Sequence, residues 1–325
     1  MQTRRSLIAG AAAAAALARP AFAADGFASF VAGVRAEAVA RGIRGATVDR
    51  AFAGVRPNQK VIKLDSAQPE FTFTWQQYKT RLVSAARVQR GREIYAQHGA
   101  LLREIGAHYG VSPGVIMGIW GLESNYGTST GGFNVIEALA TLAYQGRRTK
   151  FFRSELMDAL RILDHGDIAP ERMTGSYAGA MGQTQFMPDS FLKYAVDWHG
   201  TGRRDIWGDL GCVFASTANY LSREGWAASL PWGEQVVLPA GGIDPSEAGR
   251  DHRRPLSQWL ASGVRPVDGR AQVPPGTSTA LLLPGGARDD AYFAYYPSYQ
   301  AIRRYNPSDF YCLSVGLIGD RVVGA

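Results

Sequence analysis

The chain has 325 residues, of which 46% are hydrophobic and 19% are charged. This composition is that of a globular protein, and it excludes collagen-like, disordered and multi-span membrane proteins. The formal net charge of +7 falls to +4 without the three arginines of the first 23 residues, since 32 basic then face 28 acidic residues. Such a weak basic excess does not indicate a nucleic-acid partner.

The first 23 residues have the organisation of an export signal. A basic start is followed by an apolar run and by the small-x-small end Ala21-Phe22-Ala23. The run is too short to span a bilayer, so no membrane span is expected. Arg4 and Arg5 favour a cleavable twin-arginine signal, although a Sec signal that carries two arginines stays open. No cysteine follows the run, so we expect a periplasmic protein that is not a lipoprotein.

The rest of the chain is predicted to be predominantly helical. Residues 24–110 are expected to form an N-terminal α domain, and residues 111–230 a core of short helices joined by Gly-rich loops. Residues 231–290 are richer in Pro and Gly and contain strand-like runs, which predicts a small β-rich subdomain. The aromatic-rich residues 291–325 are expected to pack back on the helical part.

The thiols and imidazoles of the chain indicate no metal site. Cys212 and Cys312 lie far apart in the sequence. An exported protein could pair them, but two buried free thiols fit equally well. The five histidines form no HExxH pattern and no spaced cluster, so neither a cofactor nor a metal is expected.

Glu123 has an unusual position in the stretch GLESNYG. Ser112 and Pro113 are good residues for the start of a helix that is predicted to run to about Ser124, with Gly127 available to end it. Most glutamates on helices are solvated, but this one shares a face with Ile116, Ile119 and Trp120. Burial would raise its pKa and keep the carboxyl protonated, as a general acid requires.

Two further stretches carry polar and aromatic side chains. In GSYAGAMGQTQFMPDSF, residues 175–191, the glycines allow close backbone approach, and the glutamines can hydrogen-bond a neutral ligand. Asp189 is interpreted there as a helix cap. Residues 303–312, RRYNPSDFYC, combine aromatic and amide groups, which suit neutral carbohydrate. Taken alone, the first stretch could be a structural loop and the second could be packing.

No second carboxylate is placed like Glu123. A glycosidase normally uses two carboxylates. Asp189, Asp205 and Asp209 are available, but each occurs where a helix cap or a loop explains it.

At these stretches the sequence resembles the membrane-bound lytic transglycosylase B family of peptidoglycan-cleaving enzymes, glycoside hydrolase family 103. The resemblance extends from about residue 27 to the C-terminus and includes Gln68-Pro69-Glu70-Phe71, GLESNYG, Gly146-Arg147-Arg148 and Arg304-Tyr305-Asn306. It implies an α+β fold with a goose-lysozyme-like catalytic core, an added α domain and a small β insertion. It also implies periplasmic cleavage of glycan strands between N-acetylmuramic acid and N-acetylglucosamine, with 1,6-anhydromuramic ends as products.

The resemblance makes Glu123 the sole acid and base, because the sugar's own 6-hydroxyl replaces the attacking water. It implies substrate contacts for a set of matched residues: Ser176, Gln185, Phe186, Tyr220, Tyr305, Asn306, Tyr311, Arg147 and Arg148. Ser176 and Asn306 would lie nearest the reacting N-acetyl region. The two arginines would meet peptide or lactyl carboxylates, with surface ion pairs as the alternative. Partner proteins in wall synthesis or division are unknown.

The sequence departs from this family at a loop that holds calcium in some members. Asp197 and Gly202 keep positions 1 and 6 of the loop, but His199, Thr201 and Gly208 replace oxygen ligands at positions 3, 5 and 12. Calcium prefers several carboxylates, so no strong site is expected. A hydrolytic muramidase of the same fold and a non-catalytic peptidoglycan-binding protein remain the alternatives.

Overall fold

The computed structural model describes residues 19–67, 73–269, 273–286 and 290–324. Residues 1–18 of the expected signal and the Gln68-Pro69-Glu70-Phe71 stretch lie outside this part of the chain. α-Helices dominate the described residues, and they are accompanied by one five-stranded sheet and one two-stranded sheet. The expectation of a mainly helical α+β protein is confirmed.

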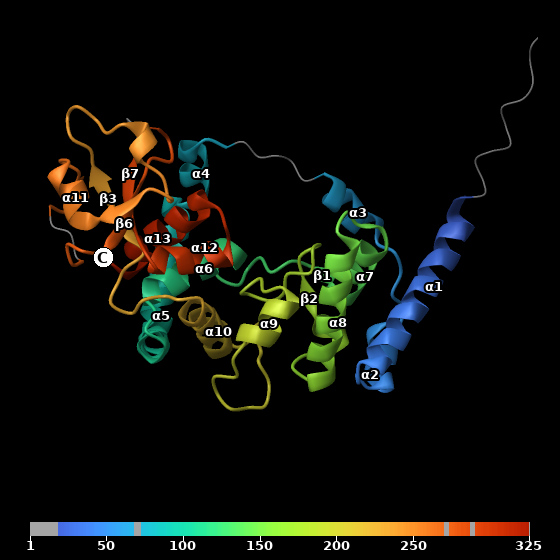
Figure 1. The fold of residues 1–325 in the computed structure, drawn as a ribbon. Helices are drawn as coiled ribbons and strands as arrows, with labels where there is room; N and C mark the ends of the chain where they lie inside the picture. Colours follow the sequence, from blue (N-terminus) through green and yellow to red (C-terminus); the bar gives the residue numbers. More distant parts are fainter. Residues whose placement is uncertain (1–18, 68–72, 270–272, 287–289, 325) are drawn as a thin grey trace, which may run out of the picture.

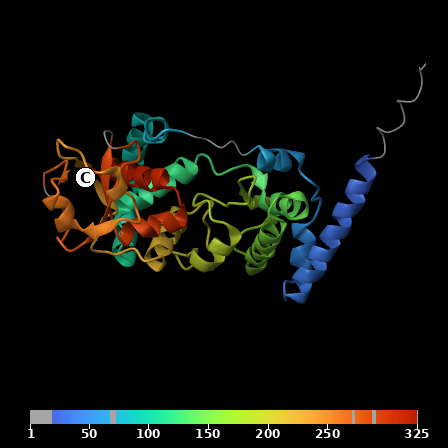
Figure 2. The same cartoon turned by 45° about the horizontal axis from the view of Figure 1, so that its top comes forward.

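The helices form two groups, one at each end of an elongated molecule (Figures 1 and 2). Helix α8 packs on α7 and on α2, while α3 and α1 also contact α7. The first group therefore joins early and middle segments of the chain. Its members are α1 (Arg19–Ala40), α2 (Gly45–Ala51), α3 (Gln59–Ser66), α7 (Val135–Gln145) and α8 (Thr149–His165).

The second group surrounds α6. Helices α5 and α13 pack on α6 and on each other, and α10 contacts α5, α6 and α12. The members of this group are α4 (Trp75–Leu82), α5 (Ala85–Tyr109), α6 (Pro113–Ser124), α10 (Leu210–Arg223), α12 (Ser298–Tyr305) and α13 (Asp309–Val323). Helices α4 and α5 are separate because Ser84 interrupts the helical pattern and caps α5 through its hydroxyl, which accepts a hydrogen bond from the Arg87 amide at 3.3 Å.

Glycines allow α6 and α13 to lie backbone to backbone. A Cβ atom on Gly118 would come within 2.2 Å of the Val315 carbonyl oxygen, and one on Gly319 within 2.4 Å of the Gly114 carbonyl oxygen. Real side chains cannot occupy such spaces. The buried residues of α6 therefore extend around nearly the whole helix rather than along one stripe.

The five-stranded sheet is antiparallel throughout, with the strand order β4-β6-β7-β3-β5. Its buried residues form a second hydrophobic cluster with α11, centred on Trp259 and Phe293. The elements are β3 (Gly233–Val237), β4 (Arg253–Pro255), α11 (Leu256–Ala261), β5 (Arg265–Pro266), β6 (Ser278–Leu282) and β7 (Ala291–Tyr295), with the short 3-10 helix η2 (Pro245–Glu247). Strands β3 and β6 occupy the strand-like runs of the sequence.

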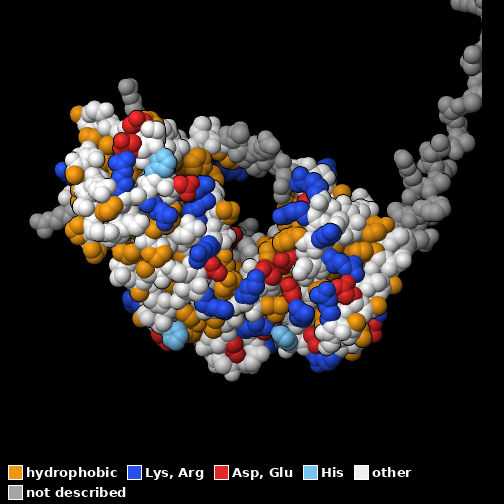
Figure 3. Space-filling view, viewed as in Figure 1, with side chains coloured by type: hydrophobic (Ala, Val, Ile, Leu, Met, Phe, Trp, Pro, Cys, Tyr) orange, Lys and Arg blue, Asp and Glu red, His pale blue; other side chains and the backbone are white. Residues whose placement is uncertain are grey.

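Short elements connect the two helical groups. Helix α9 (Pro188–Tyr194) contacts α8 on one side and α10 on the other. Strand β1 (Phe133–Asn134) follows α6, and it pairs with β2 (Thr174–Gly175), which follows the 3-10 helix η1 (Pro170–Arg172). The space-filling view shows a hollow between the two groups (Figure 3). Both cysteines are buried and free, and no helix of the described residues is long and apolar enough to cross a membrane.

Candidate active site

Glu123 lies in the last turn of α6. The helix begins at Pro113 after Ser112, as the sequence predicts, but the Ser112 side chain makes no capping hydrogen bond. The helix ends earlier than Gly127, because Asn125 and Tyr126 adopt left-handed backbone angles with φ of 48° and 57°. Asn tolerates this conformation better than most residues, but Tyr does not. Glu123 is thus one residue from the end of the helix at Ser124, where the chain turns sharply.

The environment of Glu123 suits a proton donor. Glu123 is partly exposed to solvent, but it borders three buried residues on the same face of the helix, Ile116, Ile119 and Trp120. Burial raises the pKa of the carboxyl to about 7, and a hydrogen bond from the Tyr311 hydroxyl to Oε1, at 2.7 Å, acts in the opposite direction. A group with this pKa can give and take a proton near neutral pH.

Three aromatic rings pack together near Glu123. The ring centroids of Tyr220 and Tyr305 are 4.7 Å apart, and Phe186 lies 5.8 and 5.7 Å from them. Tyr305 donates to the Thr184 carbonyl at 2.6 Å, and Tyr220 donates to the Arg304 carbonyl at 2.6 Å. Burial, followed by the Glu123 charge, raises the pKa of Tyr305 well above its usual value. The rings come from α10, α12 and the loop before α9.

The loop between β2 and α9 is held in a compact form. Isolated β-bridges join Gly175 to Met181 and Met181 to Phe186, and the Ser176 hydroxyl accepts from the Ala180 amide at 3.1 Å. Gln185 has a φ of 50°, and its side-chain amide donates to the Thr130 and Gly182 carbonyls at 3.0 and 2.8 Å. These bonds place Ser176 and Gln185 on one rigid loop with Phe186.

Gln183 connects this loop to the helix that carries Glu123. Its side-chain oxygen accepts from Trp120 Nε1 at 2.8 Å, and its amide nitrogen donates to the Trp207 carbonyl at 2.9 Å. Gln183 is 8% exposed and Trp120 is 4% exposed, so this pair is shielded from water. From the sequence, Gln183 is expected only to be able to donate and accept hydrogen bonds. Its contacts with Trp120 and Trp207 are not predicted.

The remaining predicted site residues have other contacts. The Asn306 side chain accepts from the Ser308 amide at 3.2 Å, just after α12. Arg147 donates to the Asp65 carbonyl at 2.7 Å, on α3, and the Arg148 guanidinium lies 4.9 Å from the Phe151 ring centroid. These contacts tie both arginines to the first helical group.

The other candidate carboxylates serve local structure. Asp189 is not the cap of α9: Met187 occupies the N-cap position, Pro188 begins the helix, and Asp189 pairs with Lys193 at 2.9 Å. Pro188 causes this shift because its fixed φ suits the first helical position. Asp205 accepts from the Trp207 and Gly208 amides at 2.9 and 2.8 Å, and Asp209 caps α10.

Tyr78 belongs to the same environment, although the sequence did not single it out. Burial raises the pKa of Tyr78, and the Glu123 charge raises it further. Tyr78 lies on α4, and its ring centroid is 5.5 Å from that of Phe310 on α13. The aromatic spacing of Trp75 and Tyr78 is the available sequence signal, but it is equally typical of core packing.

The loop of residues 197–209 is held by its own groups. Asp197 accepts from the Gly202 amide at 2.6 Å, and the Thr201 hydroxyl lies 3.3 Å from the same carboxylate. His199 Nε2 lies 3.4 Å from an Asp209 oxygen. Within the described ranges, no three His, Cys, Asp or Glu side chains form a group that could hold a metal ion. The contacts within this loop use carboxylate, hydroxyl and imidazole groups, whereas calcium prefers several carboxylate oxygens.

The chain is similar to known proteins over most of its length. Residues 26–320 match the family model described as "Transglycosylase SLT domain". Membrane-bound lytic murein transglycosylase B of Escherichia coli K12 is 33% identical over 252 residues, which cover 76% of this chain and 67% of that protein.

Solved structures show the same fold. SltB3 from Pseudomonas aeruginosa, in complex with NAG-anhNAM-pentapeptide, has a TM-score of 0.87 and 46% identity, over 92% of this chain and 80% of that one. The Escherichia coli lytic transglycosylase Slt35 in complex with calcium has a TM-score of 0.74 and 27% identity, over 92% and 93% of the two chains. The fold is that of the lysozyme-like transglycosylases. The chain therefore belongs to the transglycosylase SLT domain family, as a member of the lytic murein transglycosylase B group.

Proposed function

We propose that this lytic transglycosylase cleaves peptidoglycan with Glu123 as its single acid and base. Protonated Glu123 gives its proton to the oxygen between N-acetylmuramic acid and N-acetylglucosamine. The carboxylate then takes the proton of the muramic 6-hydroxyl as that oxygen attacks C1 of the same sugar. The glycosidic bond at C1 breaks, an internal glycosidic bond forms between C1 and the 6-oxygen, and no water is consumed.

The observation that carries this proposal is the isolation of Glu123. Its carboxyl has a pKa of about 7 and a tyrosine partner, whereas the candidate carboxylates Asp189, Asp205 and Asp209 are engaged elsewhere. An intramolecular nucleophile needs no second carboxylate to activate water, since it is already tethered at a high effective concentration. A lone carboxyl that can cycle between its two protonation states is therefore sufficient.

The surrounding residues are proposed to bind the sugars. Within the ring cluster, Tyr305 is partly exposed and can present an aromatic face to a pyranose ring, while the buried rings of Phe186 and Tyr220 support it. Ser176, Gln185 and Asn306 offer neutral polar groups, and Tyr311 holds the Glu123 carboxyl in position. Arg147 and Arg148 are proposed to meet carboxylates of the substrate that extend toward the first helical group, while Arg147 keeps its contact with Asp65.

The test is mass spectrometry of the fragments that the mature protein and its Glu123→Gln variant release from purified sacculi. We expect anhydro fragments, lighter by one water than reducing-end fragments, from the native protein and none from the variant. Asp205→Asn is a control carboxylate variant, and it should retain the products. Reducing-end products would show a hydrolytic muramidase instead. Binding to sacculi without any release would indicate a non-catalytic wall-binding protein.

The export route is also proposed. The twin-arginine pattern predicts that the folded protein crosses the inner membrane and acts in the periplasm without a lipid anchor. Replacing Arg4 and Arg5 by lysine should abolish periplasmic activity if the twin-arginine route is used. Unchanged export of that variant would indicate a Sec signal.

A further inference from the structure

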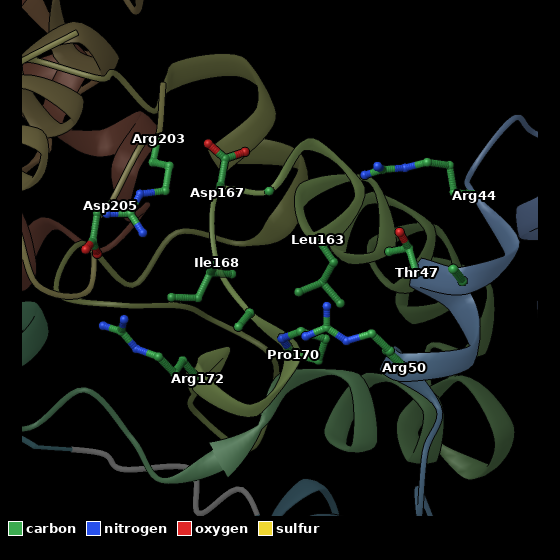
Figure 4. A pocket seen from close by; sticks show the side chains of 13 residues that line it. Arg44, Thr47, Arg50, Leu163, Asp167, Ile168, Pro170, Arg172, Arg203 and Asp205 are labelled. Carbon is green, nitrogen blue, oxygen red and sulfur yellow. The ribbon is translucent and has the colours of Figure 1, made fainter. Parts of the chain in front are cut away.

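A second hollow, whose lining does not include Glu123, lies where α2, the end of α8 and the loop of residues 197–209 meet (Figure 4). Its volume is about 440 Å³. The side chains of Arg50, Arg172 and Arg203 surround an apolar floor of Leu163, Ile168 and Pro170. We name these six residues the arginine pocket.

The carboxylates at this pocket already have other hydrogen-bond partners. Asp167 is 5% exposed and binds the Arg204 guanidinium at 2.6 and 3.0 Å. Asp205 accepts the two backbone amides described above, which are neutral donors that stabilise its charge. Neither acid therefore needs a pocket arginine as its partner.

The arginines, by contrast, keep free donor capacity. Arg172 and Arg203 form no ion pair with any described residue, and both are exposed. Arg50 approaches Glu171 at 3.7 Å, but the two side chains are 64% and 70% exposed. Such an exposed pair contributes little free energy and can exchange for a better acceptor. A fourth guanidinium, that of Arg44, also borders the space but pairs with Asp164 at 2.8 Å. Four arginines and two carboxylates thus line one concave, partly apolar space, which leaves a positive excess.

We propose that the arginine pocket binds the terminal carboxylate of a peptidoglycan stem peptide outside the catalytic site. A guanidinium offers parallel N–H donors that match a carboxylate in a two-point contact. The apolar floor fits the methyl group of a terminal alanine, which inorganic phosphate lacks. This choice of ligand rests on the proposed function, because a wall strand held at Glu123 lies among neighbouring strands that carry such peptides.

The position of the pocket supports a docking role. Arg172 ends η1, and β2 begins two residues later at Thr174 and leads to Ser176 of the proposed sugar-binding loop. Arg203 belongs to the loop of residues 197–209, where Ile206 accepts the Gln183 amide at 2.9 Å. The pocket and the catalytic site therefore share rigid backbone. A peptide held in the pocket would orient the catalytic site toward the wall without touching the reacting bond.

The experiment measures binding of the sugar-free tetrapeptide L-Ala-D-Glu-meso-diaminopimelate-D-Ala by calorimetry. We compare the native mature protein with an Arg172→Gln/Arg203→Gln double variant. Hydrogen bonds to charged groups typically contribute about 1.5–3 kcal/mol, so the double variant should bind at least about tenfold more weakly. Arg103→Gln is the matched control, because Arg103 is an exposed arginine on α5 and far from the pocket in sequence. It should bind like the native protein.

Two chemical controls identify the ligand group. The same peptide with an amidated C-terminus should bind as weakly to the native protein as the free acid binds to the double variant. Inorganic phosphate should compete only weakly. Equal binding of acid and amide, unchanged binding by the double variant, or phosphate that binds more tightly than the peptide would each overturn the inference. The double variant should still release anhydro fragments from sacculi. If the native protein itself releases none, the proposed function fails, whatever the result for peptide binding.

Discussion

At the scale of single residues, the proposed role of Glu123 as the acid predicts the pH range of the reaction. The first step needs the protonated form, and burial raises the pKa of this group to about 7. The value of kcat/KM should therefore be high below pH 7 and fall as the pH rises through 7. A rate profile of anhydro-fragment release checks this expectation. A rate that climbs through pH 7 would contradict it.

Tyr311 should tune this profile. Its hydroxyl donates to Glu123 Oε1 and so stabilises the charged carboxylate. Tyr311→Phe removes that hydrogen bond, which should raise the Glu123 pKa further and move the alkaline limb to higher pH by about one unit. Tyr95→Phe on α5 is the control and should leave the profile in place. A purely structural role for Tyr311 predicts a lower rate with an unshifted limb.

The sequence could indicate Glu123 but not all of its surroundings. A serine, a proline and an apolar run are local signals, and they place α6 correctly. The left-handed angles of Tyr126 and Gln185 depend on how the surrounding loops pack, which no local pattern encodes. Tyr78 lies close enough to sense the Glu123 charge because α4 packs against α13, and this contact spans most of the chain. The roles of the predicted site residues stay predictions.

At the scale of elements, the contact between α6 and α13 controls stability. Gly118→Ala places a methyl group where the Val315 carbonyl already lies, so the helices must separate. We expect a loss of at least about 2 kcal/mol of unfolding free energy, measured by urea denaturation. Gly33→Ala, with nothing within 4 Å of its new Cβ on α1, should instead gain up to about 1 kcal/mol. Similar effects at both positions would disprove the packing argument.

The loop of residues 197–209 should not depend on calcium. Protein hydrogen bonds hold Asp197, and Asp209 is used as the cap of α10. We therefore expect no heat of calcium binding at micromolar concentrations and no change of Tm after treatment with EDTA. Heat release with a stoichiometry of one, lost in Asp197→Asn, would show that the loop rearranges to bind the ion.

At the scale of the whole molecule, the helical contacts do not follow chain order. Helices α1–α3 pack with α7 and α8, while α5 packs with α6, α10 and α13. Helical spacing in residues 24–110 reports which residues form helices, but it carries no information on which partner each helix covers. The small sheet was predictable from its Pro- and Gly-rich composition. The division of the chain into domains stays a prediction.

The Asp290 side chain connects the edge of strand β7 to helix α4. Asp290, next to β7, accepts from Trp75 Nε1 at 3.0 Å and from Lys79 Nζ at 2.6 Å, both on α4. Burial alone would raise the pKa of Asp290, but these partners outweigh it and hold the pKa below its usual range. The charged form therefore stabilises the fold above about pH 4, and that stabilisation is lost as the pH falls further.

Asp290→Asn should then destabilise the protein by about 2 kcal/mol at pH 7, because it removes a charged acceptor from a partly buried pair. The difference from the native protein should begin to shrink below about pH 4 and should vanish only when the pH falls through the lowered pKa of the native carboxyl. Because α4 also carries Tyr78, the variant should lower the rate of anhydro-fragment release as well. Asp251→Asn, at a carboxylate that is 83% exposed, should change neither quantity. A destabilisation that persists undiminished at low pH would show that the shape of Asp290, rather than its charge, joins the sheet to the helices.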